Sequence, residues 1–374
     1  MKTYQQCKRC IMDNENDDFI TFNMDGICNY CETEMKRMSK VYFPNANGKK
    51  LFEDQIIMIK KAGEGKEYDC LMGISGGLDS SYLAFLGFKY GLRILGVHID
   101  DGFDTDVCKS NINKLFDKCK FKLINITPDE KQYNELLRAY ILAEVPNLAV
   151  LQDNLINTYL LLLAKKYKIK YFLSGGNFAT ESILQKGNTY SAYDVVNIKS
   201  INKNFGRESI DKLPLMSLIK KKLVLEKILN ISNIRLLNYV DYNREKAFSE
   251  LFNFCEYENY GAKHTENYFT IFLQLYWLPR KFGVDKRKSH YSSLIISNQM
   301  TREKALQEIN KPLIEDKDFY FLDFVSKKLD LTKEEIEIIV KRKGNQHEDY
   351  KTSLITKMLI KLVNNRESKI RKNN

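Results

Sequence analysis

The chain has 374 residues, of which 44% are hydrophobic and 29% charged, and its formal net charge is +11. This composition excludes a disordered or fibrous protein, and the length predicts two or three domains. The first residues show no apolar segment typical of a signal peptide, and the longest apolar run, near 159–164, is too short to cross a membrane. We therefore expect a cytoplasmic protein without a membrane span, whose positive charge favours a polyanionic partner.

Residues 1–45 are predicted to form a small metal-binding module, because they carry two Cys-x2-Cys pairs and little hydrophobic periodicity. Cys7 and Cys10 are separated from Cys28 and Cys31 by 17 residues, a spacing typical of zinc ribbons. Four thiolates complete a tetrahedron and leave no open position for water, which favours structural over catalytic Zn²⁺. The metal would stabilise a segment that lacks an apolar core, and an iron–sulfur cluster is the alternative.

Strands and helices alternate between residues 46 and 205, which predicts an α/β domain with a parallel, doubly wound sheet. A helix is expected at 49–61, before the first strand. The expected strands are 69–74, 93–99, 121–126 and 170–173, and the helices between them are 78–90, 107–118, 130–144 and 154–167. Ligands bind to such sheets at the carboxyl ends of the strands.

The pattern after residue 205 is mostly helical. Helices are expected at 215–229, 243–253, 267–276, 301–309 and 332–343, the last with a capping box formed by Thr332 and Glu335. We therefore predict three parts: the cysteine module at 1–45, the α/β domain at 46–205, and a helical region at 206–374 that binds substrate or a partner.

The segment Ser75–Ser80 (SGGLDS) follows the first predicted strand and opens a helix. Its glycine pair lets the backbone approach a phosphate, and the helix N-terminus offers unpaired N–H groups to an anion. Ser75, Ser80 and Ser81 add hydroxyl donors. Asp79 lies among anion-binding groups, so we expect it to bind Mg²⁺ or to support the loop. The segment lacks the lysine of a Walker A loop and resembles the SGGxDS signature of PP-loop ATP pyrophosphatases, which transfer AMP to an oxygen.

That resemblance implies an adenine site at the ends of the first two strands, near residues 72–73 and 98–99. We expect His98 to be a packed histidine or a backbone contact rather than a catalytic base. Asp100 and Asp101 follow the second strand, and they either bind Mg²⁺ or ribose or cap the next turn.

Two further polar segments belong to the predicted site. Residues 174–182 (SGGNFATES) follow the fourth strand, where Asn177 and Glu181 can orient a polar substrate or a metal, although Asn177 can equally cap the next helix. Residues 280–288 carry five basic side chains. Because this stretch contains glycine and follows a proline, we expect a loop that wraps phosphates.

The order of these motifs resembles one family over nearly the whole chain. The four-cysteine head, SGGLDSS, SGGNFATES, a GxKHxE segment at 261–266, KFGVDKRKSHYSSLI and TREKAL together look like the N-acetyl sugar amidotransferases of the PP-loop superfamily. The resemblance implies a PP-loop (adenine nucleotide alpha hydrolase-like) fold that uses ATP and Mg²⁺. The implied substrate is a nucleotide-activated N-acetyl sugar, whose acetamido group becomes an acetamidino group for lipopolysaccharide O-antigen or flagellin glycans.

The resemblance also implies roles for individual residues. The ATP site is expected to include Met72, Gly73, Ser75, Gly76, Gly77, Asp79, Ser80, Ser81, His98, Ile99, Gly175, Asn177 and Glu181. The residues expected to act chemically are Asp79, Lys263, His264, Glu266, Lys286 and Arg287. The remaining cysteines are isolated and lie in no glutaminase motif, so a separate class I glutaminase subunit is expected to supply ammonia.

Two other functions remain open at this stage. A tRNA-thiolating PP-loop enzyme would also carry SGGxDS, zinc knuckles and a basic tail, but such enzymes carry reactive cysteines in the catalytic body. A zinc-ribbon RNA-binding protein without activity would leave the intact PP-loop unexplained. We therefore expect nucleic acid not to be the partner.

Overall fold

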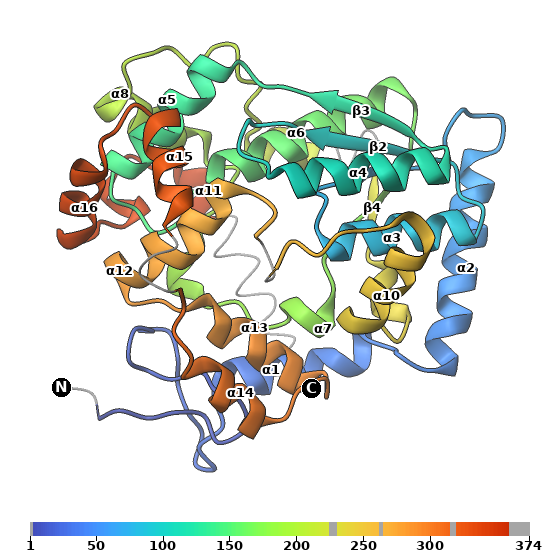
Figure 1. The fold of residues 1–374 in the computed structure, drawn as a ribbon, viewed down its shortest axis with the longest axis horizontal. Coiled ribbons are helices and arrows are strands. Elements are labelled where there is room, and N and C mark those ends of the chain that lie inside the picture. Colours follow the sequence, from blue (N-terminus) through green and yellow to red (C-terminus); the bar gives the residue numbers. More distant parts are fainter. Residues whose placement is uncertain (1–2, 224–229, 262–264, 315–318, 359–374) are drawn as a thin grey trace.

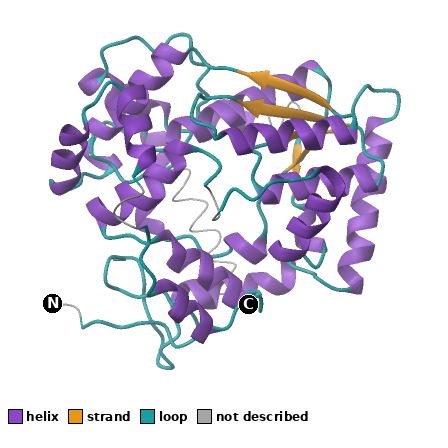
Figure 2. Cartoon of the chain, in the orientation of Figure 1, coloured by secondary structure: helices purple, strands orange, loops and turns teal. Residues whose placement is uncertain are grey.

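The computed structural model describes residues 3–223, 230–261, 265–314 and 319–358. Lys263 and His264 lie outside the described residues, as do residues 224–229 of one predicted helix. The described chain forms a parallel sheet within a mostly helical molecule (Figures 1 and 2). The strands are β1 Cys70–Gly73, β2 Ile94–Ile99, β3 Lys122–Ile126, β4 Tyr171–Leu173 and β5 Ser232–Ile234.

The five strands are hydrogen-bonded in the order β3-β2-β1-β4-β5, and every neighbouring pair is parallel. The chain moves outward from β1 to β3 and then places β4 and β5 on the other side of β1. This reversal makes the β1–β4 junction the switch point of a doubly wound sheet, where a crevice opens. The four predicted strands are confirmed. The fifth was missed because it has three residues, two of them exposed, and no alternating pattern.

Helices cover both faces of the sheet, as predicted. One face packs against α3 (Leu78–Lys89) and α4 (Asp106–Cys119), and the same core includes α2 (Ala46–Gly63) and α10 (Arg244–Cys255). The opposite face packs against α6 (Val150–Lys166). The sheet therefore lies buried between layers, as a parallel sheet requires.

A second apolar core is built mainly by helices. Trp277 is fully buried there, and its indole N–H donates to the carbonyl of Val145 at 3.0 Å. The core joins segments from before and after residue 205, so the division there stays a prediction. Its helices are α5 Glu130–Leu142, the start of α6, α8 Val195–Phe205, α11 Tyr268–Ile271, a π-helix at Phe272–Trp277, α12 Leu278–Phe282, α15 Tyr320–Lys328 and α16 Lys333–Lys341.

The remaining described elements are short or lie near the N-terminal module. The predicted capping box of α16 is confirmed, since Thr332 and Glu335 each bond the other's backbone N–H. The elements are α1 Asn29–Val41, α7 Phe178–Glu181, α9 Leu218–Lys221, α13 Lys286–Ile296, α14 Arg302–Ile309 and the 3₁₀ turns Lys186–Asn188, Leu236–Tyr239 and His347–Asp349. Among the described residues, no helix combines the length and apolar character that crossing a membrane demands.

The N-terminal module packs beside α13 and α14 at the lower edge of Figure 1. Arg302 of α14 donates to the carbonyls of Cys7 and Cys10 at 3.1 and 3.0 Å. The N–H of Ile11 donates to Ser292 Oγ at 3.3 Å. The module is therefore attached to the C-terminal helices through its cysteine knuckle.

The predicted loop at 280–288 is wrong, because the segment is largely helical. Pro279 lies in the first turn of α12, where a missing N–H costs nothing, and Gly283 ends that helix at φ +64° before α13 begins. The basic side chains are held by other elements: Lys281 lies 2.6 Å from Glu144, Arg287 lies 2.7 Å from Asp285, and Lys288 lies 2.6 Å from Asp13. These three therefore do not form a phosphate-wrapping loop.

Candidate active site

A pocket of about 440 Å³ opens at the carboxyl ends of β1 and β4, where a doubly wound sheet places its ligands. Its strand-end half is formed by residues that follow β1, β2 and β4. Its helical half is formed by the start of α6, by α11 and by the π-helix. The predicted site residues that line the pocket are Gly73, Ser75, Gly77, Asp79, Ser80, His98, Ile99, Gly175, Glu181 and Glu266.

The carbonyl groups of the SGGLDS loop are tied back by side chains. Cys108 Sγ donates to the carbonyl of Ser75 at 2.8 Å, and the hydroxyl of Tyr257 donates to the carbonyl of Gly76 at 2.6 Å. Gly76 has φ +75°, and a Cβ there would meet the Cys108 sulfur at 2.5 Å, so only glycine fits. Because the peptide unit is planar, fixing these carbonyls also fixes the N–H groups of the loop.

The N-terminus of α3 forms the floor of the strand-end half. Its N-cap is Gly77, which offers no side-chain cap. The N–H of Leu78 donates to the hydroxyl of Tyr260 at 2.8 Å, and Ser80 Oγ donates to the carbonyl of Gly77 at 3.1 Å. The N-terminus of α3 therefore directs its partial positive charge toward the pocket, where it favours a phosphate.

Asp79 is held by two residues that follow the unpredicted strand β5. The hydroxyl of Tyr242 donates to its carboxylate, and Arg244 Nη1 lies 4.0 Å from the same oxygen. Burial works against the charge of Arg244, but Asp79 together with Tyr260 and Tyr242 outweighs it and raises the pKa of the guanidinium. Arg244 also lines the pocket and so places a positive charge beside the loop. Sequence reasoning missed both residues because it missed β5.

The second glycine loop lies directly against the first. A Cβ built at Gly175 would lie 3.0 Å from the backbone nitrogen of Ser80. Asn177 Oδ1 accepts from the N–H of Thr180 at 3.0 Å, so Asn177 is the cap of α7 and does not line the pocket. Arg235, which follows β5, also lies beside this loop, since its guanidinium carbon would be 3.9 Å from a Cβ built at Gly176. It was not predicted from the sequence.

Glu266 lies against the SGGLDS loop from a distant part of the sequence. A Cβ at Gly77 would lie 2.8 Å from Glu266 Oε1. The carbonyl of Glu266 accepts from the N–H of Thr105 at 3.0 Å, which fixes the segment beside the loop after β2. The structure therefore brings a carboxylate to a loop built for phosphates, an arrangement that suits a bridging divalent cation.

His98 acts as a structural link between two parts of the pocket. Its Nδ1 lies 2.9 Å from the carbonyl of Ile74, and its Nε2 lies 3.0 Å from Asp104 Oδ2, in a contact without good hydrogen-bond alignment. Burial alone would lower the pKa of the imidazole, but Asp104 and the carbonyl raise it above its ordinary value. In these contacts His98 is a packed side chain, and its expected part in the adenine site stays a prediction.

Asp100 and Asp101 cap turns. Asp100 accepts from the N–H of Gly102 at 3.1 Å. Asp101 is buried and accepts from the N–H of Phe103, the hydroxyl of Tyr133 and the side-chain amides of Gln152 and Asn267, at 2.9 to 3.1 Å. Burial raises the pKa of Asp101 to about 6. Of the alternatives left open by the sequence, the described contacts favour the turn cap for both residues.

Several predicted site residues do not line the pocket. Met72 and Ser81 are buried in the α/β core, and Gly76 faces Cys108. Arg287 donates to Asp285 and to carbonyls at the end of α14, which are contacts of a helix junction. Lys286 is half-buried in the first turn of α13, where burial lowers the pKa of its ammonium group. Neither basic residue reaches the described pocket, so the roles expected for them lack structural support.

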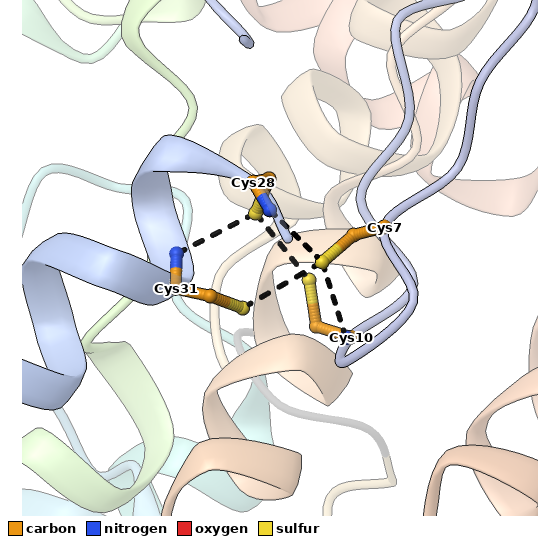
Figure 3. Close-up of side chains that lie close together, drawn as sticks. All are labelled: Cys7, Cys10, Cys28 and Cys31. Carbon is orange, nitrogen blue, oxygen red and sulfur yellow. Dashed lines mark hydrogen bonds between the residues drawn. The ribbon is translucent and has the colours of Figure 1, made fainter. Parts of the chain in front are cut away.

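The four cysteines of the N-terminal module converge at one point (Figure 3). Cys7 Sγ lies 3.9 Å from Cys31 Sγ, and Cys10 Sγ lies 3.8 Å from Cys28 Sγ. A tetrahedron with Zn–S bonds of about 2.3 Å has sulfur atoms roughly 3.8 Å apart, so the set is compatible with one zinc ion.

Backbone N–H groups also stabilise thiolates at this centre. The N–H of Cys28 points to Cys7 Sγ at 3.2 Å, and the N–H of Cys31 points to Cys28 Sγ at 3.4 Å. Hydrogen bonds among the four thiols lower the pKa of Cys7 and of Cys28 and raise that of Cys10 and of Cys31. All four sulfurs are buried, as a closed structural site requires.

Comparisons with solved structures find distant relatives of this fold. The NH₃-dependent NAD synthetase from Campylobacter jejuni is 17% identical, with a TM-score of 0.30, and the match covers 56% of this chain and 93% of that chain. The U34-tRNA thiolase NcsA from Methanococcus maripaludis, with its [4Fe-4S] cluster, is 12% identical, with a TM-score of 0.33, over 84% of this chain and 100% of that one. Values this low carry no argument about function. No curated protein matches the chain significantly.

The C-terminal part of the chain gives a more specific match. Residues 266–363 match the family model of the C-terminal domain of WbpG-like LPS biosynthesis proteins. The matched segment begins at Glu266, the residue that lies against the SGGLDS loop, and includes α11 to α16. This part of the chain is therefore similar to the C-terminal domain of the WbpG-like LPS biosynthesis proteins, in agreement with the resemblance seen in the sequence.

Proposed function

We propose that this chain is an ATP-dependent amidotransferase, which converts the acetamido group of a nucleotide-activated N-acetyl sugar into an acetamidino group. The observation that carries the proposal is the pocket that the SGGLDS loop, Arg244 and Glu266 line together with α6, α11 and the π-helix. The WbpG-like domain supports a role in making lipopolysaccharide or a related surface glycan such as a flagellin glycan.

The chemistry explains why such an enzyme needs ATP. An amide carbonyl is a poor electrophile, because its nitrogen donates electrons into the carbonyl and oxide is a poor leaving group. Transfer of AMP to the carbonyl oxygen makes that oxygen a good leaving group, and ammonia then displaces AMP to leave an amidine. The N-terminus of α3 would hold the phosphates, and Arg244 would offset the charge that develops at the α-phosphate.

Two carboxylates at the loop fit the Mg²⁺ that adenylation requires. Asp79 and Glu266 would hold the ion beside the phosphates, where it supplies charge neutralisation for the leaving pyrophosphate. Lys263 and His264 remain proposed contributors, as does Glu181 for positioning the substrate. The four-cysteine centre would hold a structural Zn²⁺, since its sulfur spacing suits one ion and its burial leaves no catalytic position.

A separate class I glutaminase subunit would supply the ammonia. The cysteines outside the module, Cys70, Cys108, Cys119 and Cys255, are all buried, and burial raises the pKa of each thiol. A glutaminase nucleophile must be exposed and readily ionised. Ammonium salts should therefore support turnover by the isolated chain, whereas glutamine alone should not.

The same observation weighs against the tRNA-thiolating alternative. Such an enzyme transfers sulfur through reactive thiols, and buried thiols with raised pKa values are inert. The four clustered cysteines lie in the N-terminal module with α7, α13 and α14 and are closed to substrate.

The test is mass spectrometry of UDP- and CMP-linked N-acetyl sugars incubated with the protein, ATP, Mg²⁺ and ammonium chloride. We expect one sugar to lose roughly one mass unit, the replacement of O by NH, while AMP and pyrophosphate accumulate. If no sugar changes but bulk tRNA stimulates pyrophosphate release, the amidotransferase proposal fails and RNA modification replaces it.

A further inference from the structure

The helical half of the pocket presents one carboxylate whose function the preceding sections do not explain. Asp153 lies in the first turns of α6 and lines the pocket. The π-helix Phe272–Trp277 contributes Leu273 and Gln274 to the same pocket. Single π-helical turns of this kind recur at functional sites, where they redirect side chains that a regular helix would aim elsewhere.

Asp153 differs from the other acidic groups of the pocket. Asp79 is held by Tyr242 and Arg244, and Asp104 by His98 and Asn267. For the carboxylate of Asp153, the residues that the structure describes provide no hydrogen bond and no ion pair, although the side chain is exposed in the pocket. An exposed carboxylate that is not engaged by the protein is available to a ligand in the pocket.

The described residues that line this half of the pocket include no cation that would keep Asp153 ionised. They include the apolar side chains of Ile156, Phe269 and Leu273 beside the amides of Gln152 and Gln274. Desolvation raises the pKa of Asp153 to about 6, and this is its single resolved cause. The titratable neighbours on other elements are phenols, not acids or bases that compete near neutral pH. Burial first, and then the charge of Asp153, raises the pKa of Tyr193 to about 12. The pKa of Tyr133 is raised well above its ordinary value by burial and then by Asp101, with a smaller effect of Asp153.

We propose that Asp153 is the base that takes the proton released when ammonia attacks the adenylated acetamido group. This inference rests on the proposed function. The nitrogen lone pair of ammonia forms a bond to the imidate carbon, and the new C–NH₃⁺ group gives one proton to the Asp153 carboxylate. The C–O bond then breaks, AMP leaves with the electron pair, and an amidinium remains. Adenylation itself releases pyrophosphate and needs no base at this position.

Adenylation and ammonia attack can be measured separately, so the test can locate the effect of Asp153 in one of them. Adenylation is followed as sugar-dependent exchange of labelled pyrophosphate into ATP, and the second half as ammonium-dependent product formation, with the UDP- and CMP-linked sugars named above. We expect Asp153→Asn to lower ammonium-dependent turnover by about 10²- to 10⁴-fold, while exchange stays within about twofold of wild type. The matched control is Asp106→Asn, which removes an exposed carboxylate from the first turn of α4 outside the pocket and should leave both rates unchanged.

A pH profile separates a chemical role from a structural one. At constant free ammonia, the wild-type rate should fall as pH drops through about 6, because the carboxylate must be ionised to accept a proton. Asp153→Asn should lose this limb, Asp153→Glu should keep it, and formate should partly restore Asp153→Ala. Normal turnover by a folded Asp153→Asn variant, or equal loss of exchange and turnover, overturns the inference while wild-type conversion still supports the amidotransferase. A wild-type protein that converts no sugar refutes the proposed function and this inference with it.

Discussion

The contact between the two glycine loops makes a sharp prediction for Gly175→Ala. A methyl group there would lie 3.0 and 3.1 Å from the backbone nitrogen and Cα of Ser80, and 3.3 Å from the carbonyl carbon of Asp79. These atoms belong to the first turn of α3 and cannot rotate away as a side chain can. The N-terminus of α3 must therefore shift by a few tenths of an ångström, and this is the part of the helix that faces the pocket.

The expected magnitude follows from two opposing effects. Overpacking typically costs about 1–3 kcal/mol, and replacing glycine by alanine at an unstrained position returns about 0.4–1 kcal/mol through the unfolded chain. Gly175→Ala should therefore destabilise the protein by about 1–2 kcal/mol. The adjacent Gly176→Ala is the matched control, because its Cβ would meet only the side-chain ends of Glu181 and Ser174, at 3.3 Å, and of Arg235, at 3.9 Å.

Urea unfolding at unchanged m-value measures the stability difference, and initial rates of pyrophosphate release measure the KM for ATP. If about 1.4 kcal/mol of binding is lost with the shifted helix, the KM for ATP rises roughly tenfold in Gly175→Ala. Equal unfolding midpoints and equal KM values for the two variants would refute the reasoning, because the backbone contact would then have no energetic weight.

Three more predictions follow from the site. Cys28→Ser, or strong chelation, should abolish metal binding and lower stability severely, because a structural zinc site contributes on the order of 10 kcal/mol. Cys255→Ser, at a buried cysteine outside the cluster, should keep the metal. Metal analysis and thermal melts of the two variants measure the difference. Because the folded pKa of His98 is raised, its ion pair with Asp104 stabilises the fold fully below about pH 6.5 and loses that contribution as pH rises through the folded pKa. His98→Gln should flatten this part of the stability–pH curve, measured by urea midpoints. Arg244→Gln should raise the KM for ATP by about 10- to 100-fold, the range set by about 1.5–3 kcal/mol for an interaction with a charged group; an unchanged KM would remove Arg244 from the phosphate site.

The elements that the sequence predicts well are those with a strong local signal. The strands from β1 to β4 and their helices follow from hydrophobic runs with clear limits, and the SGGLDS loop follows from its place after β1. The strand β5 has only three residues, so its signal is too short to detect. That one omission also hid Arg244, which lines the pocket, and Arg235 and Tyr242, which lie beside Gly176 and Asp79.

The basic segment at 280–288 shows the opposite error. Gly283 and Pro279 suggested a loop, yet each occupies a position that a helix accepts: proline in a first turn and glycine at a helix end. Composition alone suggested phosphate binding, but Lys281 and Arg287 are occupied by tertiary partners, Glu144 and Asp285. Asp153 was missed because helix α6 was expected to begin at residue 154, whereas it begins at Val150 and directs its first turns into the pocket.

The cysteine module contributes to the site through packing and not through chemistry. Its core includes Phe178 and Ala179 of α7 together with Ile296 of α13, and Tyr42 stacks on Phe178 with ring centres 5.3 Å apart. Helix α7 is only four residues long, so it lacks the hydrogen bonds that would hold it in place alone. Its position, and with it the position of Glu181 at the pocket, depends on the module on one side and on α13 on the other. A closed metal site far from the phosphate loop can therefore be required for activity because it fixes the helix that carries Glu181.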